Sequence, residues 1–343
     1  MKLNPIFTNS PWIQLESLLQ KKLYSNYFIV VDENTEIHCL GIVIQHIKDY
    51  NSKLIKIPQG ESNKSIQTCN LLWNELIEKG VDRKSVIFAL GGGVLCDLVG
   101  FCSATMLRGI DFFYIPTTLM AMVDASIGGK CGVNFLHFKN QIGVFTLPRA
   151  IVIDPIFLKT LSQRHIKNGT VEMLKHTLLK ETNLDAQILN RSLHCNLDQI
   201  IESIDFKKSI VEKDFKETKL RKILNFGHTI GHAIETYSLK DGRDYLHGEC
   251  VAVGMICELY ISAALYNWDK AILNEICDFL RPFTNQFKIS EIDFATIIEY
   301  LKIDKKTQFG TPSFSLLEQM GKPVTEIKVS EALIVKSLEF YSN

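Results

Sequence analysis

Three histidines stand close together in the second half of the chain, and their spacing is that of a metal site. His228 and His232 are four residues apart, which places both imidazoles on one face of a helix. His247 follows in the run Leu-His-Gly-Glu. Zinc binds such nitrogen donors and keeps one position open for substrate in catalytic sites. Spacing alone therefore predicts His228, His232 and His247 as joint metal ligands.

A purely structural role for these histidines competes with the metal site. A single helical histidine is more often a packed or surface residue than a ligand, but the glycines among these three favour a site. Glu172 and His176 also stand four residues apart, and this pair only imitates the spacing of a metal site. The run from His247 to Glu249 matches the H-x-E of zinc deaminases, but no P-C-x-x-C follows it, which excludes that class.

A run of three glycines, residues 91–93, follows an apolar segment and precedes one that can begin a helix. Without side chains, the backbone can approach a pyrophosphate, and the free N–H groups of a helix start favour anions. The run is not the G-x-G-x-x-G fingerprint, and a tight turn with positive φ would also require glycine here. A dinucleotide here and a metal at the histidines would together suit redox chemistry on a polyol.

The third group of residues is cationic and suits an anionic substrate. Arg108, Lys130 and Lys139 stand beside glycine or asparagine, in loop-like surroundings rather than on a repeating polar face. Such cations bind phosphate and carboxylate groups, although any single one would by default be a solvated surface charge. The other members of the group are Lys175, Lys207, Arg221 and either Lys305 or Lys306.

The elements that must position these residues differ between the two halves of the chain. Three apolar runs in the first half have the character of strands, at residues 27–31, 85–90 and 111–115. Residues 65–79 between the first two have helical spacing. This order predicts βαβ units and a mainly parallel sheet. Asp32, Gly91 and Thr117 then fall at the carboxyl ends of strands, where such sheets bind ligands.

The second half is predicted to be helical. From about residue 155 onward the apolar pattern has mostly a period of 3.6, with charged faces and few β-branched runs. The chain of 343 residues is long enough for two cores. We therefore expect two domains, residues 1–155 and residues 156–343.

Composition argues against several classes of protein. Lys+Arg and Asp+Glu number 38 each, so no net basic field attracts nucleic acid. The first residues show no signal peptide, and no apolar run reaches about 18 residues, so no membrane span is expected. The nine cysteines form no C-x-x-C pair, which favours free thiols in a cytoplasmic protein over a disulfide framework.

In their order along the chain, these motifs resemble those of the 3-dehydroquinate synthase family, within the sugar phosphate cyclases. The resemblance extends from about residue 60 to residue 310. The matching segments are Gly91-Gly92-Gly93-Val94 with Asp97, Arg108-Gly109, residues 116–119, 123–130 and 139–143, Glu172 with Lys175, Leu220-Arg221, and residues 225–235 and 246–249. The resemblance implies an N-terminal α/β, Rossmann-like NAD-binding domain and an all-α C-terminal metal-binding domain.

The resemblance also changes the predicted ligand set. In the family, one glutamate and two histidines hold zinc, and they correspond to Glu172, His228 and His247. His232 is then assigned to the substrate phosphate rather than to the metal. Zinc and cobalt both suit these donors.

Further contacts follow from the same resemblance. The NAD contacts correspond to Asp32, Asn34, Glu61, Lys64, Gly92, Gly93, Asp97, Thr117, Thr118, Lys130, Lys139 and Thr160. The substrate contacts correspond to Asp124, Lys130, Asn140, Lys175, Lys207, Arg221, Asn225 and His232. Arg108 resembles the arginine that reaches the phosphate site of the neighbouring subunit, which implies a homodimer. Lys305 or Lys306 matches a late lysine motif.

The implied reaction converts 3-deoxy-D-arabino-heptulosonate 7-phosphate into 3-dehydroquinate and phosphate, with transient oxidation by NAD. This step belongs to the shikimate pathway of aromatic amino acid biosynthesis and makes the chain a carbon–oxygen lyase. Three alternatives stay open: a cyclase that makes an inosose or a valiolone, a polyol dehydrogenase, and a binding protein without activity. Retention of Arg221, Asn225 and His232 together argues against the other cyclases.

Overall fold

The structure is a computed structural model that describes residues 2–7, 10–136, 138–180, 195–303 and 312–343. The chain forms two compact units. Unit 1 contains Met1–Ile166 and Asn196–Lys216, and unit 2 contains Lys167–Cys195 and Glu217–Asn343. The predicted domains meet at a single boundary near residue 155, whereas each of these units contains two separate segments of the chain. The domain limits themselves stay a prediction.

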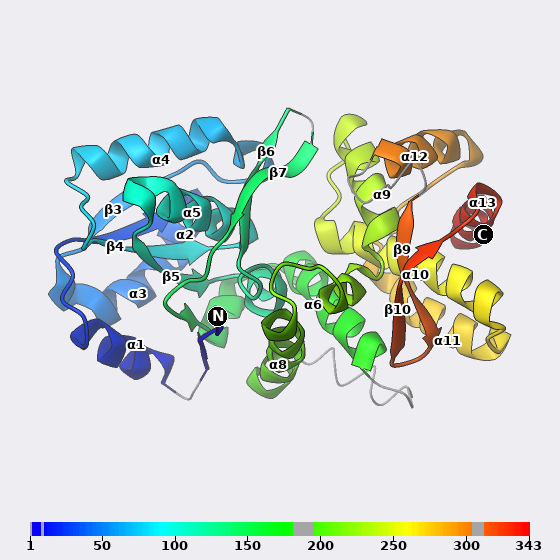
Figure 1. Cartoon of the computed structure of the whole chain (residues 1–343), viewed down its shortest axis with the longest axis horizontal. Coiled ribbons are helices and arrows are strands. Elements are labelled where there is room, and N and C mark those ends of the chain that lie inside the picture. The colour runs from blue at the N-terminus through cyan, green and yellow to red at the C-terminus, as the bar shows by residue number, and fades with distance from the viewer. Residues whose placement is uncertain (1, 8–9, 137, 181–194, 304–311) are drawn as a thin grey trace. The chain divides into compact units, whose positions relative to one another are not determined.

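A six-stranded parallel sheet forms the core of unit 1 (Figure 1). The strand order is β1-β8-β5-β4-β2-β3, and the central strand β4 is buried along its whole length, as expected where helices cover both faces. The three predicted strands are confirmed as β2, β4 and β5, which lie side by side. The strands are β1 (Pro5–Ile6), β2 (Tyr27–Val31), β3 (Lys53–Lys56), β4 (Val86–Gly91), β5 (Asp111–Pro116) and β8 (Ile151–Val152).

Helices α4 and α5 lie on one face of this sheet, and α1 and α3 lie on the other (Figure 1). The predicted helix at residues 65–79 is confirmed as α4, which begins after Ser65, whose hydroxyl accepts from the Thr68 N–H. An antiparallel pair, β6 and β7, packs against α5. The elements are α1 (Pro11–Gln20), α2 (Glu33–His38), α3 (Leu40–Ile47), α4 (Ile66–Glu78), α5 (Gly93–Thr105), β6 (Lys130–Phe135), β7 (Phe138–Phe145) and α8 (Leu197–Lys213).

Unit 2 is built around the helix α10, which contacts α9, α11 and α13. By length and composition α10 is apolar enough to cross a membrane, but 78% of its apolar window is buried within the structure, as in a core helix. The elements are α9 (His228–Lys240), α10 (His247–Tyr266), α11 (Lys270–Leu280), α12 (Glu291–Ile303), β9 (Ser313–Gln319), β10 (Lys322–Lys328) and α13 (Glu331–Ser342), and α6 (Gln163–Lys180) lies mostly in this unit.

The predicted fold class is confirmed, with one addition. An all-α second half was expected, and its described part is mainly helical, but β9 and β10 form an antiparallel pair that packs on α10. The sequence did not indicate this strand pair, because the two-residue apolar period of a strand is obscured here. The buried Leu317 interrupts the alternation of Phe314, Leu316 and Met320.

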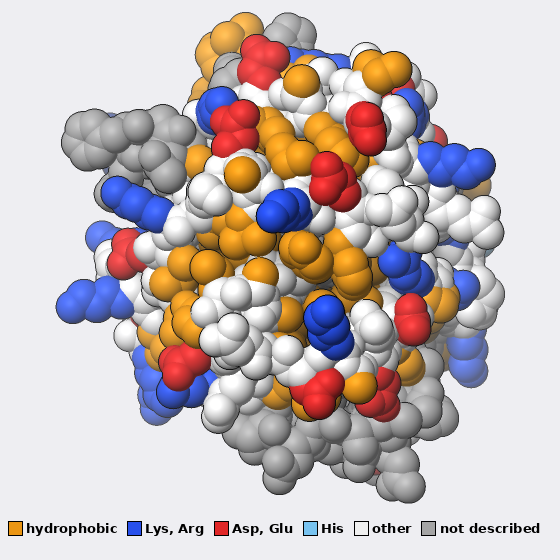
Figure 2. Space-filling view, turned by 90° about the vertical axis from the view of Figure 1, so that its right-hand side faces the viewer, with side chains coloured by type: hydrophobic (Ala, Val, Ile, Leu, Met, Phe, Trp, Pro, Cys, Tyr) orange, Lys and Arg blue, Asp and Glu red, His pale blue; other side chains and the backbone are white. Residues whose placement is uncertain are grey.

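Two surface and redox expectations can be compared with the structure. All nine cysteines are free, and only Cys195 is less than fully buried, which agrees with the predicted reduced thiols. The face shown in Figure 2 has exposed apolar side chains interspersed with both acidic and basic side chains. This mixture agrees with the balanced charge of the sequence.

Candidate functional site

The three predicted histidines come together in unit 2. His228 is the first residue of α9, His247 is the first residue of α10, and His232 lies one turn into α9. One ring nitrogen of each lies within 4.8 Å of those of the other two. The ring centroids are 5.1 Å apart for His228 and His232, 5.3 Å for His228 and His247, and 5.6 Å for His232 and His247. The starts of two helices therefore place three nitrogen donors around one point.

The close packing of α9 and α10 makes this convergence possible. A Cβ atom at Gly254 would lie 2.0 Å from the Gly227 carbonyl oxygen, and one at Gly231 would lie 3.1 Å from the Val251 Cα. Gly227 has φ of 78°, a left-handed conformation that favours glycine. These glycines thus allow two helix backbones to touch beside the imidazoles.

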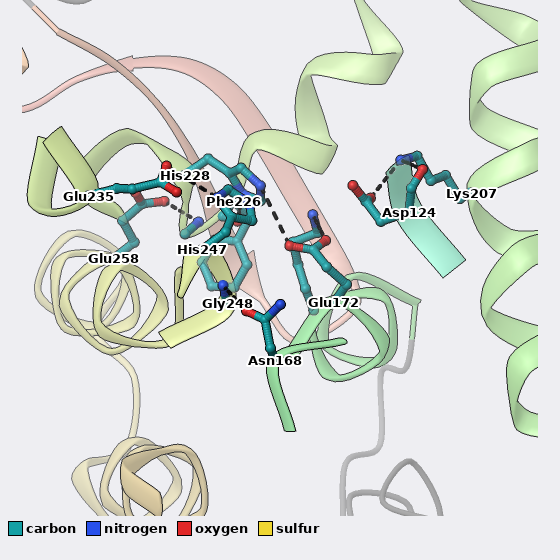
Figure 3. A network of polar contacts seen from close by, with 12 residues as sticks. Asp124, Asn168, Glu172, Lys207, Phe226, His228, Glu235, His247, Gly248 and Glu258 are labelled. Carbon is teal, nitrogen blue, oxygen red and sulfur yellow. Dashed lines mark hydrogen bonds and ion pairs between the residues drawn. The ribbon is translucent and has the colours of Figure 1, made fainter. Parts of the chain in front are cut away.

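Glu172 brings a carboxylate to the same cluster from α6. Its side chain is fully buried, and its Oε1 lies 3.6 Å from the His228 Nε2 (Figure 3). The ammonium group of Lys175, also buried, pairs with the other carboxylate oxygen of Glu172. One turn before Glu172, Asn168 Oδ1 accepts the Gly248 N–H at 2.6 Å and so fastens α6 to the start of α10. The same face of α6 therefore offers a donor and positions the helix that begins with His247.

Hydrogen bonds at Nδ1 orient two of the imidazoles. His228 Nδ1 lies 3.1 Å from the Phe226 carbonyl oxygen, and His247 Nδ1 lies 3.3 Å from Glu235 Oε2 (Figure 3). A ring that donates from Nδ1 keeps Nε2 as an acceptor, the state needed for a metal ligand. Both rings are thus arranged as ligands with an outer partner.

The donor chemistry fits a divalent transition metal. Imidazole nitrogen with carboxylate oxygen suits zinc and cobalt. Both predicted sets are present in this cluster, because His232 lies with the other two imidazoles and Glu172 lies beside His228. The assignment of Glu172 to the metal and His232 to the phosphate therefore stays a prediction.

The other predicted substrate residues of unit 2 lie before α9. Arg221 and Asn225 belong to a 3-10 turn, Leu220–Asn225, and Arg221 is buried. The Asn225 amide donates to Glu217 Oε1 at 2.5 Å, which fixes its orientation. Lys305 and Lys306 lie outside the described residues.

In unit 1 the glycine run connects β4 to α5, at the carboxyl edge of the sheet. None of residues 91–93 has positive φ, so the alternative of a left-handed turn is wrong. Close approach accounts for the run instead: a Cβ at Gly92 would lie 3.3 Å from Thr118 Cγ2, and one at Gly93 would lie 3.0 Å from Ala125 Cβ. The Thr117 N–H donates to the Gly91 carbonyl at 3.0 Å and ties the ends of β5 and β4 together. The N-cap Gly92 and the first helical residue Gly93 therefore leave the backbone at the start of α5 without side chains, which suits an anion site.

Polar residues predicted to contact NAD gather beside this turn. Lys64 Nζ donates to Asp97 Oδ2 at 2.5 Å and to Asn140 Oδ1 at 2.6 Å. Lys139 Nζ lies 3.4 Å from Glu61 Oε1. Burial lowers the pKa of Lys64, but the carboxylates of Asp97 and Glu61 outweigh it and raise that pKa above its ordinary value. Burial raises the pKa of Asp97, against the effect of Lys64. These residues form one charged network around a buried ammonium group.

A second ion pair in unit 1 joins Lys207 on α8 to Asp124. Lys207 Nζ donates to Asp124 Oδ1 at 2.6 Å and to the Asp124 carbonyl at 2.7 Å (Figure 3). Two contacts from one residue hold the ammonium in a single position. Lys130 begins β6 and is exposed. Arg108 is also exposed, at φ of 67°, in a turn after α5.

The remaining predicted NAD residues lie at other edges of the unit. Asp32 follows β2 and caps α2, because its Oδ1 accepts the Thr35 N–H at 2.8 Å. Asn34 lies in α2, and Thr160 ends the 3-10 segment Pro155–Thr160. Asp32 therefore lies at the carboxyl end of a strand next to β4, as predicted from the strand pattern.

Three residues that support the imidazole cluster received no role from the sequence: Asn168, Glu235 and Glu258. Glu235 lies seven residues after His228, on the same face of α9, and that spacing was available as a clue. Glu258 is the one acid in the mostly apolar residues 250–261 of α10 and is fully buried. No sequence pattern indicates the role of Asn168, because its partner is a backbone group 80 residues away.

Comparison with known proteins agrees with this architecture. Residues 54–168 match the family described as 3-dehydroquinate synthase N-terminal, and residues 169–307 match 3-dehydroquinate synthase C-terminal. A 3-dehydroquinate synthase from Parabacteroides distasonis is 35% identical over 333 residues, which cover 96% of this chain and 94% of the relative.

Two solved cyclase structures are also similar. A 2-deoxy-scyllo-inosose synthase, in complex with carbaglucose-6-phosphate, NAD+ and Co2+, has a TM-score of 0.82 and 26% identity, covering 95% of this chain and 94% of that one. The 2-epi-5-epi-valiolone synthase ValA from Streptomyces hygroscopicus subsp. jinggangensis 5008, with NAD+ and Zn2+ bound, has a TM-score of 0.82 and 24% identity, covering 95% of this chain and 93% of that one. At this identity the likeness shows the fold alone. The family matches over both halves and the relative that spans nearly the whole sequence show that the chain belongs to the 3-dehydroquinate synthase family.

Proposed function

We propose that this chain converts 3-deoxy-D-arabino-heptulosonate 7-phosphate into 3-dehydroquinate and phosphate, as a lyase that depends on NAD and a divalent metal. Membership of the family supports the reaction. The observation that carries the metal-dependent part is the imidazole cluster with the buried Glu172 carboxylate beside His228.

Glu172, His228 and His247 would hold zinc or cobalt, with the two imidazoles presenting Nε2. When bound, the metal acidifies a substrate hydroxyl as a Lewis acid, and NAD accepts and later returns a hydride. Glu172 brings negative charge into a buried position, where the Lys175 ammonium group pairs with it. Glu235 and Glu258 place two further carboxylates beside the helix starts that carry the imidazoles, and a bound dication would balance these two negative charges.

The substrate carries a carboxylate and a phosphate, and the cations of the chain suit both groups. Arg221, Lys207 and Lys130 are proposed to hold the carboxylate and nearby oxygens. Lys207 is already oriented by Asp124, so little side-chain freedom is lost when it binds. A fixed ammonium group stabilises developing negative charge without reorganisation during the reaction.

The phosphate is proposed to bind His232, Asn140 and Arg108, and its own oxygens can take the proton whose removal precedes elimination. The exposed position of Arg108, in a turn after α5, suits an arginine that reaches the site of a second copy of the chain. This arrangement would make the protein a homodimer. We also place the protein in the cytoplasm, in keeping with its nine free cysteines.

NAD is proposed to bind at the glycine turn of unit 1, with its pyrophosphate at Gly92, Gly93 and the first turn of α5. Asp97, Lys64, Lys139 and Glu61 form the adjacent charged network. A cationic group within this network can bind an anionic cofactor without leaving its carboxylate partners unpaired.

The test is phosphate release from the heptulosonate phosphate, measured with catalytic NAD and zinc while NADH absorbance is followed. The proposal expects phosphate and dehydroquinate in equal amounts with no accumulation of NADH. Steady formation of NADH without phosphate would identify a polyol dehydrogenase. Turnover of glucose 6-phosphate instead would identify an inosose synthase, the class of one similar structure.

A further inference from the structure

Glu258 is a buried acid whose carboxylate reaches the first turn of α9. It lies on α10 among apolar residues, and its side chain is fully buried. Its Oε2 accepts the Gly227 N–H at 2.6 Å, and its Oε1 accepts the Ile230 N–H at 3.1 Å. The first N–H groups of a helix have no partner within the helix. Glu258 therefore caps α9 from a neighbouring helix, at a position where the N-cap residue Gly227 has no side chain to do so.

The peptide between Phe226 and Gly227 connects this carboxylate to an imidazole. Its N–H donates to Glu258, and its carbonyl oxygen lies 3.1 Å from His228 Nδ1 (Figure 3). Hydrogen bonds in series polarise one another, so a charge at one end strengthens the bond at the other. The carboxylate thus acts on His228 through one peptide, whereas Glu235 lies directly beside His247 Nδ1.

Helix electrostatics give Glu258 a second effect. His228 is the first residue of α9, and the start of a helix has a positive partial charge, about half an elementary charge, that disfavours a cation. A dication held by this residue would therefore meet repulsion from the helix that presents it. The carboxylate of Glu258, in contact with two of the N–H groups, offsets that partial charge.

We propose that Glu258 is a positioning residue of the metal centre, which orients His228 through the Phe226–Gly227 peptide and makes the start of α9 compatible with a bound dication. This inference rests on the proposed metal centre. Outer partners of metal ligands contribute about 10–100-fold in metal affinity, and we expect an effect of this size from Glu258.

Two variants separate this role from simple stabilisation. Glu258→Gln keeps the shape of the side chain but removes its charge and turns one acceptor into a donor that faces an N–H. Ser262→Ala is the matched control, because Ser262 is buried one turn further along α10. The Ser262 hydroxyl accepts the Leu317 N–H at 3.1 Å and donates to the Glu258 carbonyl at 2.8 Å, so its loss removes buried hydrogen bonds without touching the carboxylate.

The experiment measures zinc affinity by competition with a chromogenic chelator, the visible spectrum of the cobalt-loaded protein, and thermal stability of the metal-free protein. We expect Glu258→Gln to bind zinc about 10–100-fold more weakly and to show an altered cobalt spectrum. Ser262→Ala should lose thermal stability and keep both metal properties. Unchanged zinc affinity and an unchanged spectrum in Glu258→Gln would overturn the proposal and leave Glu258 as a helix cap.

Two further outcomes bear on the role of Glu258. If Glu258→Gln does not fold, Glu258→Asp gives the same test, since its carboxylate is retracted by one methylene; wild-type affinity and spectrum in that variant would refute the role. If the wild-type protein binds neither zinc nor cobalt, the proposed metal centre is wrong, and the proposed role of Glu258 is refuted as well. Normal phosphate release by the wild type, with Glu258→Gln unchanged in metal binding, would refute only the inference about Glu258.

Discussion

The two candidate sites of this molecule are built in opposite ways. The glycine turn of unit 1 offers bare backbone: residues 91–93 have no side chains, and they are small because Thr118 and Ala125 lie against them. The cluster of unit 2 offers side chains, three imidazoles and a buried carboxylate, whose positions depend on outer partners such as Glu235. A backbone site requires little more than a strand, a turn and a helix, whereas a side-chain site requires distant residues to hold each donor.

The ion pairs beside the two sites differ in how deeply they are buried. In unit 1, the ammonium groups of Lys64 and Lys207 are paired with carboxylates at 2.5 Å and 2.6 Å. In unit 2, Glu172 and Lys175 pair with each other, are almost completely buried, and lie beside imidazole donors suited to a cation. Removal of a ligand in unit 2 should therefore have a larger effect than a change in the turn of unit 1.

The largest expected effect is that of His228→Ala. This variant removes a predicted ligand, and the lost Lewis-acid contribution of several kcal/mol corresponds to a decrease of about 10³-fold or more in kcat. Zinc content by atomic absorption should fall to near zero after dialysis. Full zinc content in the purified variant would mean that His228 is no ligand.

His232→Ala distinguishes the two predicted ligand sets. If His232 contacts the phosphate, the variant keeps its zinc and loses about 10²–10³-fold in kcat, as expected for one charge-stabilising donor. The same dialysis and zinc assay checks the result, with His228→Ala as the reference for a lost ligand. A variant that loses its metal would instead restore the three-histidine set predicted from spacing.

The contrast between the two sites also decides what the sequence could predict. The strands at residues 27–31, 85–90 and 111–115 followed from local patterns, because a parallel strand buried on both faces is a continuous apolar run. The glycine run that follows the second of these strands was visible in the same way. The histidine cluster followed from i, i+4 spacing and was confirmed as a cluster. Its outer residues did not follow, since Asn168 and Glu258 act on backbone groups that lie far away in the sequence.

Gly254→Ala tests whether the cluster depends on the contact between α9 and α10. The added Cβ would lie 2.0 Å from the Gly227 carbonyl oxygen, so the helices must separate, and we expect about 3 kcal/mol of destabilisation or more. Gly41→Ala in α3 is the control, because no atom lies within 4 Å of its Cβ and alanine should stabilise that helix by up to about 1 kcal/mol. Urea unfolding measures both; equal stability of the two variants would show that the helix contact is not required.

The smallest expected effect is that of Gly92→Ala, in the turn of unit 1. The new Cβ would lie 3.3 Å from Thr118 Cγ2, so a shift of a few tenths of an ångström is enough to admit it. The methyl group would nevertheless occupy backbone surface that a pyrophosphate has to approach, and we expect NAD to bind about tenfold more weakly, a loss of about 1.4 kcal/mol. Calorimetric titration with NAD measures the loss, and zinc affinity in the same variant is the internal control.

Wild-type NAD affinity in Gly92→Ala would place the cofactor away from this turn. If zinc affinity fell together with NAD affinity, the two sites would be coupled. The backbone site and the side-chain site could then not be compared as independent regions.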